Sequence, residues 1–183
     1  MKTIATPLVI MGAIAASLLY LNAANSSEED AGRRHAADVI PASNPVYVKE
    51  CGACHMAYSP GLLPARSWTA LMGKLDDHFG DNAELDTATH AVIVDYLSAN
   101  SADNSDYRRS QRIMRSLNRN ATPLRISEVP YIKREHHELP GRVFRTRPEL
   151  KSLSQCNGCH TQAAKGSFAE REINLPGVGR WED

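Results

Sequence analysis

The sequence predicts a mainly α-helical protein with irregular loops, built as two small domains. Apolar residues recur at steps of three and four in three segments, the spacing of an amphipathic helix. The best strand candidate, 126–131, is short and is interrupted by Pro130. One five-residue motif occurs on each side of a polar stretch at 100–106. We therefore predict an N-terminal domain at 46–103 and a C-terminal domain at 104–183.

The N-terminal segment has the composition of an export signal. A basic residue precedes an apolar run at 8–21, which is short for a membrane-spanning helix and matches the apolar part of a secretory signal. Ala23 or Ala24 supplies the small residue before a cleavage site. We expect a signal peptide at 1–24, a polar tether at 25–45 and a periplasmic protein. An uncleaved N-terminal membrane anchor is the alternative.

The cysteines indicate the cofactor. All four lie in two copies of the pattern C-x-x-C-H, which is the attachment signature of a c-type haem. Two cysteines at this spacing reach the two vinyl groups of one haem and form thioethers, and the next residue, histidine, then binds the iron. We therefore predict two covalently bound haem c groups. The residues are Cys51, Cys54 and His55 in the first motif, and Cys156, Cys159 and His160 in the second.

Other uses of four cysteines explain the pattern less well. An exported protein can form two disulfides, and two C-x-x-C pairs can bind zinc. Neither use requires a histidine directly after the second cysteine of both pairs. No cysteine is left over, and haem attachment occurs outside the bacterial cytoplasm, which agrees with an export signal.

The ligand on the far side of each iron must be sought between the motifs. No histidine or methionine follows His160, so the second iron takes its ligand from upstream, from another chain or from Lys165, or it stays open. A carrier of the cytochrome c4 type, with a methionine downstream of each motif, is therefore disfavoured. The candidates are Met56, Met72, His78, His90, Met114, His136 and His137.

Helical phase favours one histidine for the first haem. A helix predicted over 67–79, with Ser67 as its N-cap, places His78 on its apolar face. A second predicted helix, capped by Asp86 and ending near Asn100, places His90 on its own apolar face. We prefer His78 and keep His90 as the competitor.

The same argument favours His136 for the second haem. A short helix predicted over 127–139 places His136 with Val129 and Ile132, and His137 on the charged side. Both irons would then be bis-histidine ligated, which lowers the potential and leaves no open position. We predict a low-potential electron carrier and not an enzyme. A small haem reductase or peroxidase with an iron that can open is the alternative.

Charge is segregated although the net charge is zero. The stretch 76–106 contains eight acidic and no basic residues, and 108–147 contains eleven basic and three acidic residues. The balance gives no indication of nucleic-acid binding, and the segregation can orient an encounter with a redox partner protein. The arginines of a helix predicted to start near Ser105 either form a solvated face, neutralise haem propionates or steer a partner. They are Arg108, Arg112, Arg115 and Arg119.

The chain resembles the bacterial dihaem cytochrome c family that includes the dihaem partner of the sphaeroides haem protein. The resemblance implies two small cytochrome c-like haem domains, low potential, and bis-histidine ligation through His78 and His136. It also implies electron donation to a small monohaem cytochrome or exchange with a membrane b-type cytochrome. It extends from about 47 to 176 and is carried by 51–60, 62–64, 66–68, 71–83, 96–97, Asn100, 134–136, 156–160, Gly166, Phe168 and Ile173.

Overall fold

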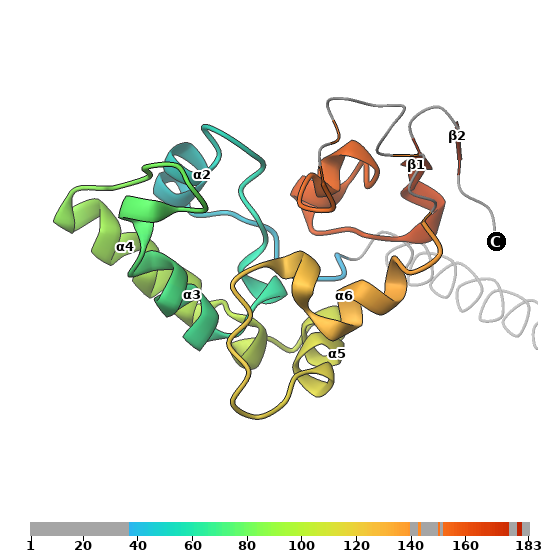
Figure 1. The fold of residues 1–183 in the computed structure, drawn as a ribbon, viewed down its shortest axis with the longest axis horizontal. Coiled ribbons are helices and arrows are strands. Elements are labelled where there is room, and N and C mark those ends of the chain that lie inside the picture. Colours follow the sequence, from blue (N-terminus) through green and yellow to red (C-terminus); the bar gives the residue numbers. More distant parts are fainter. Residues whose placement is uncertain (1–36, 140–142, 144–149, 151, 176–178, 181–183) are drawn as a thin grey trace, which may run out of the picture. The chain divides into compact units, whose positions relative to one another are not determined.

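The computed structural model describes residues 37–139, 143, 150, 152–175 and 179–180 (Figure 1). These residues belong to one compact unit that begins at Ala37. The predicted signal peptide and most of the predicted tether lie outside the described residues. None of the described helices is both long and apolar enough to cross a membrane.

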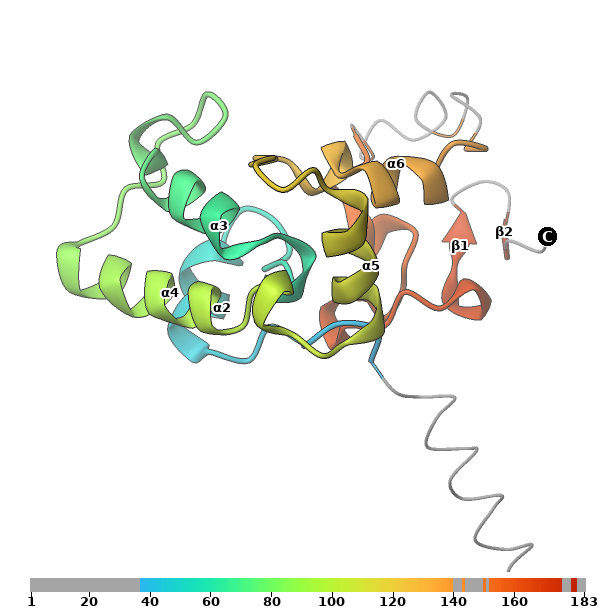
Figure 2. The same cartoon turned by 90° about the horizontal axis from the view of Figure 1, so that it is seen from below.

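Three helices form the N-terminal half of the described chain: α2 (Pro45–Cys51), α3 (Ala65–Met72) and α4 (Thr87–Ala99). Asn44 caps α2 by accepting a hydrogen bond from the backbone N–H of Tyr47, and a proline occupies the first helical position. Asp86 caps α4 as predicted, because its Oδ1 accepts from the N–H groups of Ala88 and Thr89, each at 3.0 Å. Helices α3 and α4 lie side by side (Figure 2).

The bounds predicted for α3 are wrong. The helix begins directly after Pro64, and the buried Ser67 hydroxyl has no hydrogen-bond partner among the described residues instead of capping the helix. It ends at Met72 because Gly73 follows, and the chain continues as a 3-10 turn at Leu75–Asp77. His78 therefore does not lie on this helix.

Helices α5 (Arg108–Ser116) and α6 (Pro130–Glu135) pack against each other in the C-terminal half (Figure 2). Both are shorter than predicted. Helix α5 begins at Arg108 and not near Ser105. Pro130 starts α6 because proline is favoured at the first helical position, while the preceding Ile126–Glu128 forms a separate 3-10 turn. The chain leaves the helix at His136.

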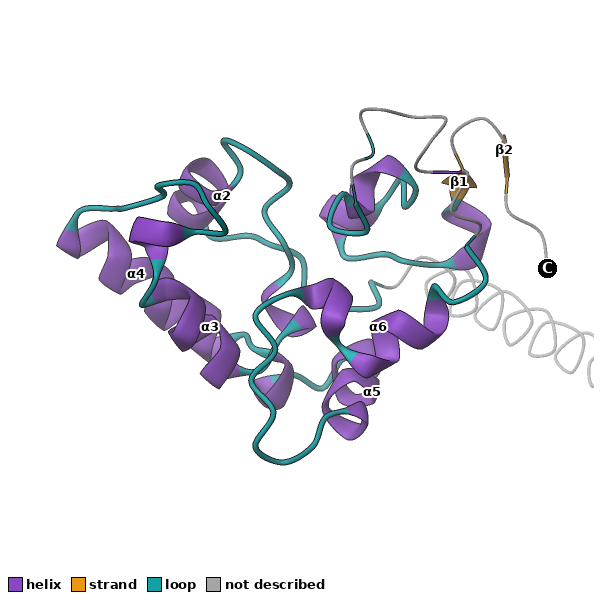
Figure 3. Cartoon of the chain, in the orientation of Figure 1, coloured by secondary structure: helices purple, strands orange, loops and turns teal. Residues whose placement is uncertain are grey.

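Little strand is present among the described residues (Figure 3). Strands β1 (Asn174–Leu175) and β2 (Gly179–Arg180) form one short antiparallel pair, in which Asn174 is opposite Arg180. The predicted mainly α class with irregular loops is confirmed. Further 3-10 turns span Pro60–Leu62, Ala102–Asn104, Cys156–Gly158, Ala163–Lys165 and Glu170–Glu172.

The two predicted domains share an apolar core in the structure. Buried Leu62 and Trp68 of the N-terminal half and Ile113 and Tyr131 of the C-terminal half belong to the same cluster. Backbone N–H groups of 38–39 also donate to the carbonyl of Gly166 at 2.8 and 3.1 Å. That glycine has φ +76°, and a side chain there would lie 2.4 Å from the carbonyl oxygen of Val39. The division at 103/104 stays a prediction.

Candidate haem sites

The first motif lies at the end of α2. Cys51 is the last residue of the helix, Cys54 is exposed in the following turn, and His55 comes directly after it. The His55 Nδ1 lies 2.8 Å from the carbonyl oxygen of Met56. Because a carbonyl only accepts, Nδ1 carries the proton, and the lone pair of Nε2 is left for a metal.

His78 faces His55 across the first site. Their ring centroids lie 6.3 Å apart, and their planes are 23° from parallel. Two imidazoles on opposite sides of one metal ion, each with a metal–nitrogen bond of about 2.0–2.1 Å, place their ring centroids roughly 6.3 Å apart. The spacing of His55 and His78 therefore fits one iron between them.

A tight turn holds His78 in this position. Its N–H donates to the carbonyl of Asp81 at 2.7 Å, and the two residues form an antiparallel bridge. The central residues, Phe79 and Gly80, have φ of 59° and 102°. Positive φ at both positions is the geometry of a type I′ turn, which asparagine and glycine usually occupy, so phenylalanine carries backbone strain here.

The second motif has the same kind of arrangement. Its histidine, His160, faces His136 at the end of α6, with ring centroids 5.9 Å apart and planes 75° apart. The His136 Nδ1 lies 2.8 Å from the carbonyl oxygen of Ile132. This contact places the proton on Nδ1 and leaves the lone pair of Nε2 for a metal; histidines that bind metals are commonly held by such a hydrogen bond from the other ring nitrogen.

A cavity of about 570 Å³ surrounds the second pair of histidines. Ligand pockets of this kind measure about 300–1,000 Å³, so it can take a large planar cofactor. Two buried polar atoms on its lining, Nδ1 of His160 and Nε of Arg109, have no hydrogen-bond partner among the described residues. The facing histidines, the cavity and the unpaired Arg109 Nε, which can pair with a haem propionate, fit a haem. Its lining includes Arg109, Tyr131, His136, Cys156, Cys159, His160 and Phe168.

Burial favours the neutral form of His160 and His78, which is the form that binds a metal. It lowers the pKa of His160 to about 4, with smaller contributions from His136 and Arg109. Burial, followed by His55, also lowers the pKa of His78. A neutral imidazole has a free lone pair for iron, so a lowered pKa favours iron binding by His160 and His78.

The described cysteines do not favour the disulfide or zinc alternatives. All four are unpaired. Burial raises the pKa of Cys51 and of Cys156 to about 11. No group of three or more potential metal-ligating side chains occurs among the described residues.

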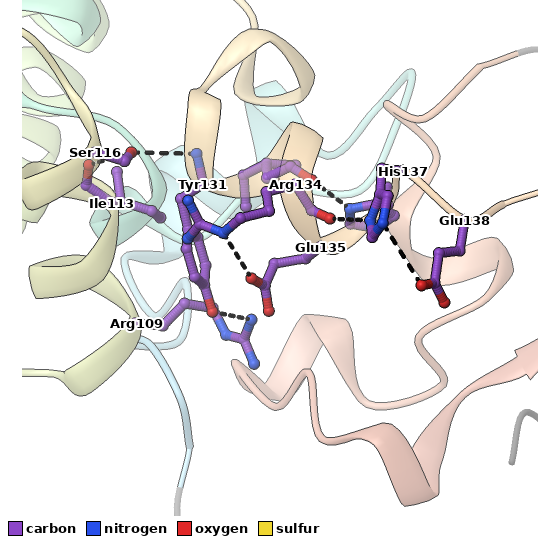
Figure 4. Close-up of polar contacts among 10 residues, drawn as sticks. Arg109, Ile113, Ser116, Tyr131, Arg134, Glu135, His137 and Glu138 are labelled. Carbon is purple, nitrogen blue, oxygen red and sulfur yellow. Dashed lines mark hydrogen bonds and ion pairs between the residues drawn. The ribbon is translucent and has the colours of Figure 1, made fainter. Parts of the chain in front are cut away.

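The competing ligands point elsewhere. The His90 Nε2 donates to the carbonyl of Met72 at 3.0 Å. His137 is exposed, with Nδ1 2.7 Å from the carbonyl oxygen of Arg134 and Nε2 3.5 Å from Glu138 (Figure 4). Met72 and Met114 pack in or against the apolar core. The assignment of His78 and His136 stays a prediction, which these positions support.

Three side chains at the sites were not selected as functional residues from the sequence. Tyr58 stacks on His55 with ring centroids 4.8 Å apart, and Phe168 contacts His160 edge-on at 5.2 Å. Arg109 lies between the rings of Tyr131 and Phe168 and donates to the Tyr131 hydroxyl at 3.1 Å (Figure 4). Only 6% of residues are aromatic, so an aromatic residue close to a haem motif could have been selected from the sequence as a candidate site residue.

The fold and the two sites define a c-type cytochrome. A mainly helical chain carries two C-x-x-C-H motifs, and each motif histidine faces a second histidine. The family model described as dihaem cytochrome c matches residues 47–168. The chain belongs to this dihaem cytochrome c family, and it is an electron-transfer protein with two covalently bound c-type haems.

Solved structures agree with this assignment. A diheme cytochrome c from Rhodobacter sphaeroides is 46% identical with a TM-score of 0.64, covering 71% of this chain and 100% of that chain. A diheme cytochrome c from Shewanella baltica is 40% identical with a TM-score of 0.62, covering 76% of this chain and 98% of that chain. No curated protein sequence matches significantly.

Proposed function

We propose that this protein is a periplasmic, low-potential electron carrier in which His55 and His78 bind one iron and His136 and His160 bind the other. Each haem, when bound, supplies a one-electron change at its iron. The observation that carries the proposal is the spacing of the two imidazole pairs, 6.3 and 5.9 Å. Imidazole stabilises ferric iron more than a thioether does, so both haems have low potentials.

Full ligation also favours a carrier over an enzyme. An iron with two imidazoles has no open position for oxygen, peroxide or another small substrate. The chain's own contribution is to hold the imidazoles: the turn at 78–81 positions one, and the carbonyl of Ile132 orients another. A carrier needs ligands that stay in place while the iron changes charge.

The export signal predicted at 1–24 supports a periplasmic location. Bacterial c-type cytochromes are typically exported, because haem is attached outside the cytoplasm. The same segment, if uncleaved, would anchor the protein at the membrane. Mass spectrometry of the purified holoprotein distinguishes the two, since cleavage removes the first 24 residues.

A basic surface beside the second haem site suggests the chemistry of a partner. Arg112 of α5 and Arg134 of α6 line the cavity, and the other exposed basic residues lie on the same two helices. Five exposed basic side chains on α5 and α6, named at the end of this paragraph, form the surface. Of these five, only Arg134 has an ion pair within the described residues, with Glu135 at 3.7 Å. We expect an acidic redox protein to dock here, such as a small monohaem cytochrome or a periplasmic part of a membrane b-type cytochrome. The basic surface consists of Arg108, Arg112, Arg115, Lys133 and Arg134.

Near-infrared magnetic circular dichroism with EPR on the oxidised holoprotein tests the ligation. Two low-spin bis-imidazole haems support the proposal. A thioether-to-iron band would overturn it and place Met72 or Met114 in a site. A high-spin haem would mean an open iron, and rapid carbon monoxide binding to the reduced protein would then favour an enzyme.

A further inference from the structure

One tyrosine contacts both haem sites. Tyr58 lies three residues after His55, and its ring stacks on that imidazole with centroids 4.8 Å apart and planes 27° apart. Its hydroxyl donates to the carbonyl oxygen of Ser154 at 2.7 Å, across 96 positions of sequence. Ser154 lies two residues before the first cysteine of the second motif.

The contact continues to the second motif. The same Ser154 carbonyl oxygen lies 3.7 Å from the sulfur of Cys156, which attaches the second haem. From His55 to this sulfur, the path therefore crosses the gap between two stacked rings, the ring of Tyr58, one hydrogen bond and one sulfur–oxygen contact. Electron tunnelling falls steeply with each gap between atoms, so a nearly continuous path of this kind is favourable.

The tyrosine is held firmly in place. Its carbonyl accepts a hydrogen bond at 2.8 Å from the hydroxyl of Tyr47, which is buried against α4. Two residues later, the carbonyl of Pro60 accepts from the indole N–H of buried Trp68 at 2.7 Å. Segment 58–60 is thus fixed to α2 and α3, and the path between the sites has a defined length.

We propose that Tyr58 is the residue that couples the two haems electronically. One electron leaves the reduced site and arrives at the oxidised site. No bond is made or broken, the phenol keeps its proton, and Tyr58 is neither oxidised nor reduced. The inference rests on His55 being an iron ligand, as proposed above, but not on the identity of either distal ligand or on a partner.

Flash photoreduction of the oxidised holoprotein tests this coupling. A photogenerated flavin semiquinone delivers one electron, and the phase whose rate is independent of protein concentration reports transfer between the haems. Tyr58→Phe keeps the ring on His55 but loses the bond to Ser154, so this phase should slow several-fold. Tyr96→Phe is the matched control, because its hydroxyl accepts from the N–H of Ser43 and contacts neither site; its rate should equal that of the wild type.

The two reduction potentials and the oxidised EPR spectrum are measured in every variant. A slower phase in Tyr58→Phe with unchanged potentials and spectrum supports the proposal. An unchanged rate would overturn it and assign the coupling to another route. A slower rate accompanied by shifted potentials would also overturn it, because Tyr58 would then act on the first site alone. If the proposed bis-histidine ligation is wrong, the magnetic circular dichroism and EPR spectra of the wild type show a thioether ligand or a high-spin haem, independently of the Tyr58 variant.

Discussion

The imidazole rings of His136 and His160 face each other with their planes crossed at 75°. The rings of His55 and His78 lie only 23° from parallel. Parallel imidazoles donate into the same iron d orbital and split it from its partner, whereas crossed imidazoles raise both orbitals almost equally. We expect the oxidised protein to show two different low-spin EPR signals: a rhombic one from the first site and a strongly anisotropic one, with a larger maximum g value, from the second.

Ligand variants assign these two signals. His78→Ala should remove the rhombic signal alone, and His136→Ala the anisotropic one alone. Two superimposable rhombic signals in the wild type would contradict the crossed geometry at the second site.

The first-site ligand can be tested against its competitor. His78→Ala should convert one of the two haems to high spin, because the iron loses an imidazole at the position opposite His55. His90→Ala should leave both haems low-spin and lower the free energy of unfolding by about 1 kcal/mol, because it removes a hydrogen bond to the carbonyl of Met72. Optical spectra and denaturant titrations of the two holoproteins measure these effects. The opposite pattern would make His90 the ligand.

Adjacent histidines provide an equally close comparison at the second site. We expect His136→Ala to produce a high-spin haem, because His136 faces His160 and is oriented by the carbonyl of Ile132. His137→Ala removes an exposed side chain beside Glu138 and should leave the spectrum unchanged. If only the second variant changed coordination, His137 would replace His136 in the site.

The two distal histidines show what the sequence could and could not predict. The cap of α4 by Asp86 could be predicted because it is a local interaction. The side chain accepts hydrogen bonds from backbone N–H groups only two and three residues further along the chain. Periodicity also placed His136 on the apolar side of the helix predicted over 127–139, although α6 ends one residue earlier, at Glu135. His78 was chosen from a helix that in fact stops at Met72, and it reaches the site through a turn instead. A positive φ is uncommon for phenylalanine, so the type of residue at position 79 did not predict this turn.

The arginines illustrate the same limit. The predicted arginine stripe selects exposed side chains, of which Arg108, Arg112 and Arg115 lie on α5, whereas Arg119 follows the end of the helix at Ser116. The half-buried one, Arg109, falls outside that stripe and contacts Asp38, Tyr131 and Phe168, which are remote from it in sequence. Which member of a basic helix turns inward depends on these distant segments, so composition alone could not identify it.

The turn that carries His78 should be sensitive at its glycine. Gly80 has φ +102°, where an alanine side chain is disfavoured, so Gly80→Ala should lower the free energy of unfolding of the holoprotein by about 1–2 kcal/mol. Gly73→Ala is the control, because Gly73 has φ −77° and a side chain there meets only ordinary contacts. Guanidinium titration followed by far-ultraviolet circular dichroism measures both. Equal effects of the two substitutions would mean that the turn is not strained in the way described.

The basic surface should make electron transfer to anions depend on salt. Ferricyanide is a trivalent anion, so the surface on α5 and α6 should attract it, and oxidation of the fully reduced holoprotein should slow as ionic strength rises. Arg112→Gln combined with Arg115→Gln should slow this reaction several-fold at low salt and have little effect at high salt. Lys49→Gln, which removes one exposed positive charge on α2, is the control and should change the rate much less. With the cationic oxidant tris(phenanthroline)cobalt(III), the stopped-flow oxidation rate of the double arginine variant at low salt should not fall below that of the wild type. An unchanged ferricyanide rate in that variant would mean that electrons leave the protein elsewhere than beside the second haem.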